Sequence, residues 1–231
     1  MKKLFVSIIL LLTGLSVFAQ SASEGNVFYP EAQKDAQVIC GNARFTVLTS
    51  RLIRMEWAEN GIFEDRATLG IVNRNLPVPE FKVKKSSSKT IITTSDLTLE
   101  YKGTGKFDAN NLSVTFTMAD PSSKKGVKKV TWRPGMDDSG NLLGTARTLD
   151  KCDGEKTMEP YDKGILSRDG WAIVDESDRH VFVPVDSDWK YWVEPRDDKD
   201  RQDLYIFAYG HDYMDALADF TKVAGKIPLP P

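Results

Sequence analysis

Apolar and polar residues alternate in short runs along most of the chain between Val38 and Tyr209. Turn-forming pairs such as Gly41–Asn42 and Ser95–Asp96 separate the runs. An alternation of period two places apolar side chains on one face of a strand. Strands this frequent predict an all-β fold, an antiparallel β-sandwich. The predicted strands are 38–40, 45–47, 52–56, 81–84, 90–94, 97–101, 112–116, 127–133, 142–149, 164–174, 181–185, 191–193 and 204–209.

The pattern becomes helical near the C-terminus. Tyr213, Leu217, Phe220 and Ala224 have the spacing of one helical face, which predicts a helix over 211–224. Gly225 is a natural stop, and three prolines follow it by residue 231. We therefore take 38–210 as the sandwich and 211–231 as a helix and proline-rich linker, with a further domain expected after it.

The N-terminus has the organisation of a signal peptide. Lys2 and Lys3 precede the apolar run Leu4–Leu12, and small residues stand at the cleavage positions before Gln20. We expect cleavage after Ala19, so 1–19 is a signal peptide and the protein is periplasmic or secreted. Residues 20–37 are polar and are expected to form a lead-in segment.

Composition excludes several classes of function. The formal net charge is −2, and the lysines at 124–129 lack interleaved aromatic residues, which argues against nucleic acid as a partner. The apolar run near the N-terminus is too short for a membrane anchor, so no membrane partner is expected. His180 and His211 lack metal-ligand spacing, and we expect neither a metal nor another cofactor. Cys40 and Cys152 are expected to remain unpaired, because two cysteines form no disulfide framework.

Charged, aromatic and glycine residues concentrate between Asn141 and Ser177. Carbohydrate sites combine a flat aromatic ring with planar hydrogen-bonding side chains. This stretch supplies that combination, so we predict substrate-binding residues here. The alternative is an ion network among the charged residues, with the tryptophan in the core. The predicted substrate-binding residues are Arg147, Asp150, Asp153, Arg168 and Trp171.

Several stretches together resemble one enzyme family. They are RFTVLTSRLIRMEWAENGIFEDRATLGIVNR (44–74), NLLGTARTLD (141–150), GILSRDGWAIVDES (164–177) and DLYIFAYGHDYMDALADFTKVAGKIPLPP (203–231). They resemble the N-terminal, galactose mutarotase-like β-sandwich domain of glycoside hydrolase family thirty-one, the α-glucosidase and α-xylosidase family. The resemblance covers nearly all of the chain after the signal peptide.

The resemblance implies a specific division of labour. In that family the sandwich packs on a (β/α)8 barrel that carries both catalytic aspartates of a retaining mechanism, and a sandwich loop helps to shape the substrate site. The matching stretches contain neither catalytic motif, so no residue here is assigned a catalytic role. The expected partners are an α-linked oligosaccharide and the protein's own barrel. An independent carbohydrate-binding sandwich is the alternative, and a mutarotase acting alone lacks suitable histidines.

Overall fold

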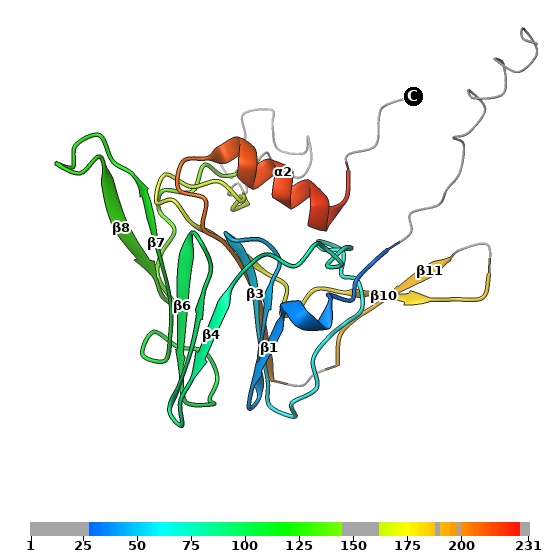
Figure 1. The fold of residues 1–231 in the computed structure, drawn as a ribbon. Helices are drawn as coiled ribbons and strands as arrows, with labels where there is room; N and C mark the ends of the chain where they lie inside the picture. The colour runs from blue at the N-terminus through cyan, green and yellow to red at the C-terminus, as the bar shows by residue number, and fades with distance from the viewer. Residues whose placement is uncertain (1–27, 145–161, 188–189, 198–199, 227–231) are drawn as a thin grey trace, which may run out of the picture.

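The computed structural model describes residues 28–144, 162–187, 190–197 and 200–226. Two antiparallel five-stranded sheets face each other and form a β-sandwich, as the alternation predicts (Figure 1). The first sheet has the strand order β1-β2-β3-β12-β9. Its strands are β1 (Gln37–Cys40), β2 (Ala43–Val47), β3 (Leu52–Ala58), β12 (Arg201–Phe207) and β9 (Ala172–Asp175).

The second sheet is a meander of sequential strands in the order β4-β5-β6-β7-β8. Buried and less buried residues alternate along its central strands β6 and β7, so one face meets the core. Its strands are β4 (Lys82–Lys85), β5 (Lys89–Thr93), β6 (Leu97–Lys102), β7 (Leu112–Ala119) and β8 (Val127–Trp132).

The main hydrophobic core fills the space between the sheets. Phe45 and Met55 enter it from the first sheet, and Leu99 and Val114 enter it from the second. The ring centroids of Phe45 and Tyr101 lie 5.4 Å apart across this space, in an edge-to-face arrangement.

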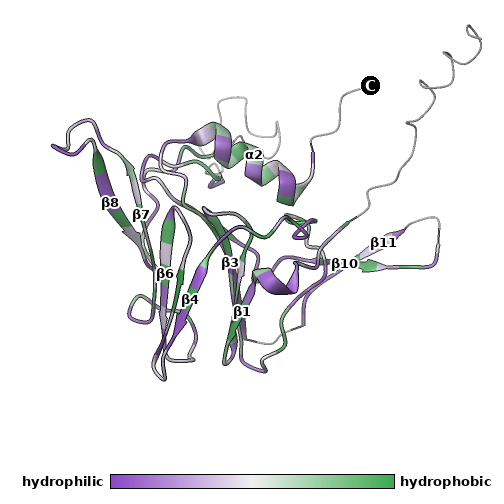
Figure 2. Ribbon diagram, in the orientation of Figure 1, coloured by the Kyte–Doolittle hydropathy of each residue, from purple (hydrophilic) through white to green (hydrophobic). Residues whose placement is uncertain are grey.

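A second cluster lies on the outer face of the first sheet, beneath helix α2 (Tyr213–Ala224). Figure 1 shows α2 across one end of the strands, and Figure 2 shows green and purple bands alternating along it. The helix buries Ala216 and Val223, whereas Leu217 is 39% exposed. The predicted apolar face is therefore wrong at Leu217, because the helix is rotated to centre its buried side between Ala216 and Val223.

Two smaller elements complete the fold. The hairpin of β10 (Val181–Pro184) and β11 (Tyr191–Glu194) projects from the body (Figure 1). A 3-10 helix, η1 (Lys34–Ala36), precedes β1. The expected lead-in is held to the body here, because Tyr29 N donates to Val72 O at 3.1 Å.

Two predicted strands differ from the structure. In the predicted strand 164–174 only residues from Ala172 onward form β9, and 164–171 is a loop. In the predicted strand 142–149, residues 142–144 are not in a strand, and the remainder lies outside the described residues. The signal peptide and Cys152 also lie outside them, and Cys40 is a free cysteine.

Candidate functional site

The side chain of Asn141 is the centre of the region that the sequence singles out. Its Nδ2 donates to Asp138 Oδ2 at 2.5 Å and to Gly164 O at 2.9 Å. Its Oδ1 accepts from the backbone nitrogens of Leu143 at 2.8 Å and Gly164 at 2.9 Å. Asn141 is only 6% exposed, so this buried amide uses both its donor and its acceptor atoms. It therefore fixes two chain segments that lie far apart in sequence.

Backbone hydrogen bonds extend this connection in both directions. Leu142 N donates to Leu166 O at 2.9 Å, and Gly144 N donates to Asp162 O at 2.7 Å. Residues 144 and 162, which flank the undescribed residues 145–161, are thus hydrogen-bonded neighbours. We call the set of bonds that joins 138–144 to 162–168 the loop clasp.

The buried carboxylate of Asp138 adds a second side-chain hydrogen bond to the loop clasp. Asp138 is 6% exposed, and its Oδ1 accepts from Ser167 Oγ at 2.6 Å. Arg168 N also donates to Gly140 O at 2.8 Å. Buried polar groups that are fully hydrogen-bonded hold a local geometry firmly, because any rearrangement leaves them without partners.

Two of the predicted substrate-binding residues are described. Arg168 is exposed, and its carbonyl oxygen lies 3.0 Å from His211 Nε2. Trp171 is 4% exposed and packs beside Trp132, with ring centroids 6.3 Å apart. Its side chain therefore belongs to the main core cluster. Arg147, Asp150 and Asp153 lie outside the described residues.

A small cleft opens between the edge strands β8 and β9, next to the loop clasp. It has a volume of about 280 Å³. Trp132 and Trp171 line it together with polar residues from the first sheet and from the loop clasp. Lys163 at its rim forms an ion pair with Asp137, with Nζ and Oδ1 3.5 Å apart. The other polar residues of the lining are Asp138, Asp175 and Gln202.

A buried ion network on the outer face of the first sheet was not anticipated from the sequence. Arg54 Nε and Nη2 donate to the two carboxylate oxygens of Asp203 at 2.8 and 2.7 Å. Arg44 Nε donates to Glu56 Oε2 at 2.7 Å, and Arg196 Nη2 donates to Asp203 Oδ2 at 2.6 Å. Arg54 and Asp203 are each 1% exposed.

The network shifts the pKa values of its carboxyl groups in opposite directions. Burial alone would raise the pKa of Asp203, but Arg54 and Arg196 lower it well below its ordinary value. Burial raises the pKa of Glu56, against the opposing effect of Arg54. Arg54, Glu56 and Asp203 do not line the cleft beside the loop clasp.

The described ranges contain neither a group of metal ligands nor a helix that could cross a membrane. No group of three or more His, Cys, Asp or Glu residues there has the arrangement of a metal site. No helix there combines the length and the apolar character needed to cross a bilayer.

Comparisons with known proteins give matches only among solved structures. No protein-family profile and no curated protein matches the chain. Two matching structures are of a family 31 glycoside hydrolase from Flavobacterium johnsoniae, a dextranase. One is a mutant in complex with isomaltotriose, at 15% identity, and the other is a complex with glucose, at 14% identity. Both have a TM-score of 0.47, and each match covers 89% of this chain and 29% of the dextranase chain. The chain therefore spans less than a third of the length of that enzyme.

Proposed function

We propose that the chain is the noncatalytic N-terminal module of an exported α-glycosidase. In this proposal a (β/α)8 barrel in the same protein hydrolyses an α-linked oligosaccharide, and the sandwich packs on the barrel and contributes residues 145–161 to the substrate site. The sequence resemblance across 44–74, 141–177 and 203–231 supports this assignment. Export rests on the signal peptide predicted for residues 1–19.

The loop clasp is the observation that carries the proposal. A long loop is able to position side chains for a ligand only where its ends are fixed on a rigid scaffold. Here the bond from Gly144 N to Asp162 O joins the ends, and the buried pair Asn141 and Asp138 holds both flanking segments. The loop contains Arg147, Asp150 and Asp153, whose planar charged groups suit sugar hydroxyls.

The exposed side of α2 supports the packing on a second domain. Met214 is 76% exposed and Leu217 is 39% exposed, whereas the opposite side of the helix is buried. The helix is anchored by Ala216 and Val223, which are buried against the first sheet. Arg51 also donates to Asp212 and Asp215 at 2.7 Å each. Exposed apolar side chains on a fixed helix are suited to contact with another protein surface.

Single substitutions in the longer protein, with its barrel, test the contribution of the loop. Arg147→Ala, Asp150→Ala and Asp153→Ala should each be assayed with an α-linked oligosaccharide. We expect at least one to raise KM about tenfold to a hundredfold, the loss associated with one charge-assisted hydrogen bond. Because these residues bind substrate and do not react with it, kcat should change far less.

Lys125→Ala in the exposed turn between β7 and β8 is the matched control, and it should leave KM unchanged. The proposal is wrong if all three loop variants have the KM and kcat of the unmodified enzyme.

A further inference from the structure

The hairpin of β10 and β11 exposes a large aromatic side chain. Trp192 is 62% exposed, more than any other tryptophan, tyrosine or phenylalanine in the described ranges. The strand register pairs Trp192 with Val183, so the two side chains share one face of the hairpin. The indole group forms no hydrogen bond and no ring contact with the part of the chain that the structure describes.

The opposite face of the hairpin is held against the body. Phe28 packs on Phe182 and Tyr191, with ring centroids 4.8 and 4.5 Å apart. At the base of the hairpin, β10 forms an isolated bridge with Thr68, and Phe182 N donates to Ala67 O at 2.8 Å. The open face is therefore carried by a supported pair of strands, and such support keeps a binding side chain in position.

Two charged side chains flank the indole ring of Trp192 on the open face. Lys190 and Glu194 stand two residues before and two residues after it, so their side chains leave the strand about 7 Å on either side. Neither forms a hydrogen bond or an ion pair within the described ranges. The pKa of Arg66 is raised by its hydrogen bond to Glu64 and, to a smaller extent, by the charge of Glu194, so a guanidinium group lies near the same rim.

This arrangement of side chains suits a sugar ring. A pyranose has a face of C–H groups that packs on an aromatic ring, and hydroxyl groups around its rim that both donate and accept hydrogen bonds. The indole ring of Trp192 provides the flat apolar surface. The carboxylate of Glu194 accepts from a hydroxyl group, the ammonium group of Lys190 donates to one, and their charges strengthen both bonds.

Other classes of ligand fit this face less well. A protein partner would have to supply a counter-charge on each side of the ring, whereas the cores of protein interfaces are depleted of charged residues. A nucleic acid stacks on aromatic rings in a positively charged groove, but this face carries one carboxylate for one ammonium group. An anionic lipid surface would repel Asp186 and Asp188, which the sequence places in the turn of the hairpin.

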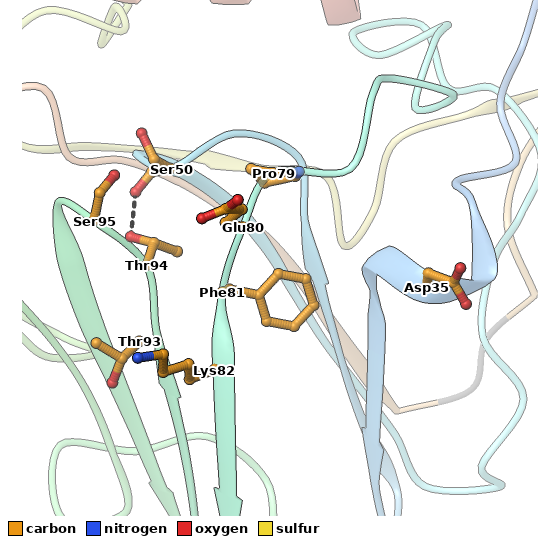
Figure 3. A pocket seen from close by; sticks show the side chains of 9 residues that line it. All are labelled: Asp35, Ser50, Pro79, Glu80, Phe81, Lys82, Thr93, Thr94 and Ser95. Carbon is orange, nitrogen blue, oxygen red and sulfur yellow. Dashed lines mark hydrogen bonds between the residues drawn. The ribbon is translucent and has the colours of Figure 1, made fainter.

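The hollow beside β4 lacks such an arrangement. It has a volume of about 750 Å³, and its lining includes Phe81 and Lys82. Figure 3 shows Lys82 on one side of β4 and the ring of Phe81 on the other side, directed toward Asp35. The ring and the ammonium group therefore do not face one ligand there, whereas on the hairpin they share a face.

We propose that the face of β10–β11 that carries Trp192 binds a neutral glycan, with one pyranose unit stacked on the indole ring. The site uses no residue of the loop clasp or of 145–161, so the inference does not rest on the proposed function. It would hold the chain on a glycan whether or not the same glycan is hydrolysed by another domain.

The indole N–H signals of the chain in a ¹H–¹⁵N correlation spectrum test the site directly. The variant Trp192→Phe identifies the signal of Trp192 by its loss. Titration with maltotetraose, isomaltotetraose and xylotetraose should shift that signal saturably with at least one of the three. The signals of the buried Trp132 and Trp171 should stay in place.

Affinity electrophoresis in native gels measures the contribution of the ring. At least one gel with dextran, soluble starch or xylan should retard the chain, and a gel with dextran sulfate reports attraction to charge alone. Trp192→Ala should weaken the apparent affinity about tenfold, the loss expected for one aromatic stacking contact. Val193→Ala is the matched control, because Val193 lies next in the strand but on the opposite face, paired with Phe182. It should be retarded like the unmodified chain.

Three results would overturn the inference. They are an unshifted Trp192 signal with all three oligosaccharides, retardation by dextran sulfate alone, and undiminished retardation of Trp192→Ala, with near-UV circular dichroism as the check on folding. Light scattering adds a fourth. If Trp192→Ala converts a dimeric chain into a monomer and leaves glycan retardation unchanged, the face is an interface between two copies of the chain.

Discussion

Arg54 on β3 and Asp203 on β12 form a two-pronged ion pair inside the protein, where water does not reach either group. Removing a charge from water costs several kcal/mol, and only good geometry with complete hydrogen bonding offsets that cost. Both carboxylate oxygens of Asp203 accept from Arg54, and Oδ2 also accepts from Arg196. The pair therefore depends on each partner being charged and in place.

Asp203→Asn should lower the free energy of unfolding by about 3–5 kcal/mol, because Arg54 and Arg196 both lose the carboxylate that they share. Only Glu56, which also pairs with Arg44, then remains as a counter-charge beside Arg54. Asp212→Asn is the matched control: Asp212 also pairs with an arginine, Arg51, but its side chain is 68% exposed. An exposed ion pair contributes about 1 kcal/mol or less to the free energy of unfolding. Urea denaturation of the two variants measures the difference, and equal small losses would contradict the account.

The ion pair of Arg54 and Asp203 also makes the free energy of unfolding depend on pH. The folded pKa of Asp203 is lowered, so its stabilising contribution is present above the unfolded pKa of about 3.9. That contribution is lost as the pH falls through the still lower folded pKa. The difference in unfolding free energy between the unmodified protein and Asp203→Asn should therefore shrink as the pH falls from about 5 toward 2. A difference that stays constant would show that Asp203 is not held ionised by Arg54.

This network marks a limit of prediction from sequence. Charged residues at alternate strand positions, such as Arg44, Arg54 and Glu56, ordinarily indicate a solvated face. Here that face is covered by the segment after β3, whose Glu64 carbonyl accepts from Arg54 Nη2 at 2.8 Å. The covering segment has no periodic pattern of its own. The strands were therefore predictable, whereas the burial of their charged side chains was not.

At the scale of elements, the alternation of apolar and polar residues predicted strands in both sheets. The helical spacing predicted a helix that begins two residues before α2 and ends with it. It failed at 164–171, where apolar residues flank glycines but no ladder forms. Asn141 and Ser167 form an isolated antiparallel bridge there, and their side chains bond to nearby backbone and to Asp138. Such local side-chain bonds compete with the extension of the bridge into a ladder. The positions of Arg168 and Trp171 depend on these side-chain hydrogen bonds, which cannot be predicted from the periodicity of apolar residues.

Gly170 is the tightest point between this loop and the sheets. Its φ is +82°, and a Cβ there would lie 2.7 Å from Met118 Sδ and 3.2 Å from Gly210 Cα. Gly170→Ala should therefore suffer both backbone strain of about 1–2 kcal/mol and overpacking of about 1–3 kcal/mol. Thermal and urea unfolding should show the combined loss.

Gly126 provides the control for Gly170. Its φ is +70°, but no atom lies within 4 Å of the position a Cβ would take. Gly126→Ala should therefore show the strain alone, about 1–2 kcal/mol. Equal losses in the two alanine variants would mean that Met118 moves aside at no cost and that the loop does not depend on this contact.

At the scale of the whole molecule, the sandwich is a rigid support with distinct surfaces. The loop clasp joins 138–144 to 162–168, and α2 exposes Met214 and Leu217. The proposed function assigns these surfaces to the support of a separate catalytic barrel.

Turnover of aryl α-glycosides measures that role most directly. The chain alone, and a longer polypeptide that carries the proposed barrel, should be incubated with 4-nitrophenyl α-glucoside and α-xyloside. We predict release of 4-nitrophenol by the longer polypeptide and none by the chain alone. Release by the chain alone that disappears on substitution of Asp150 or Asp153 by asparagine would contradict the account.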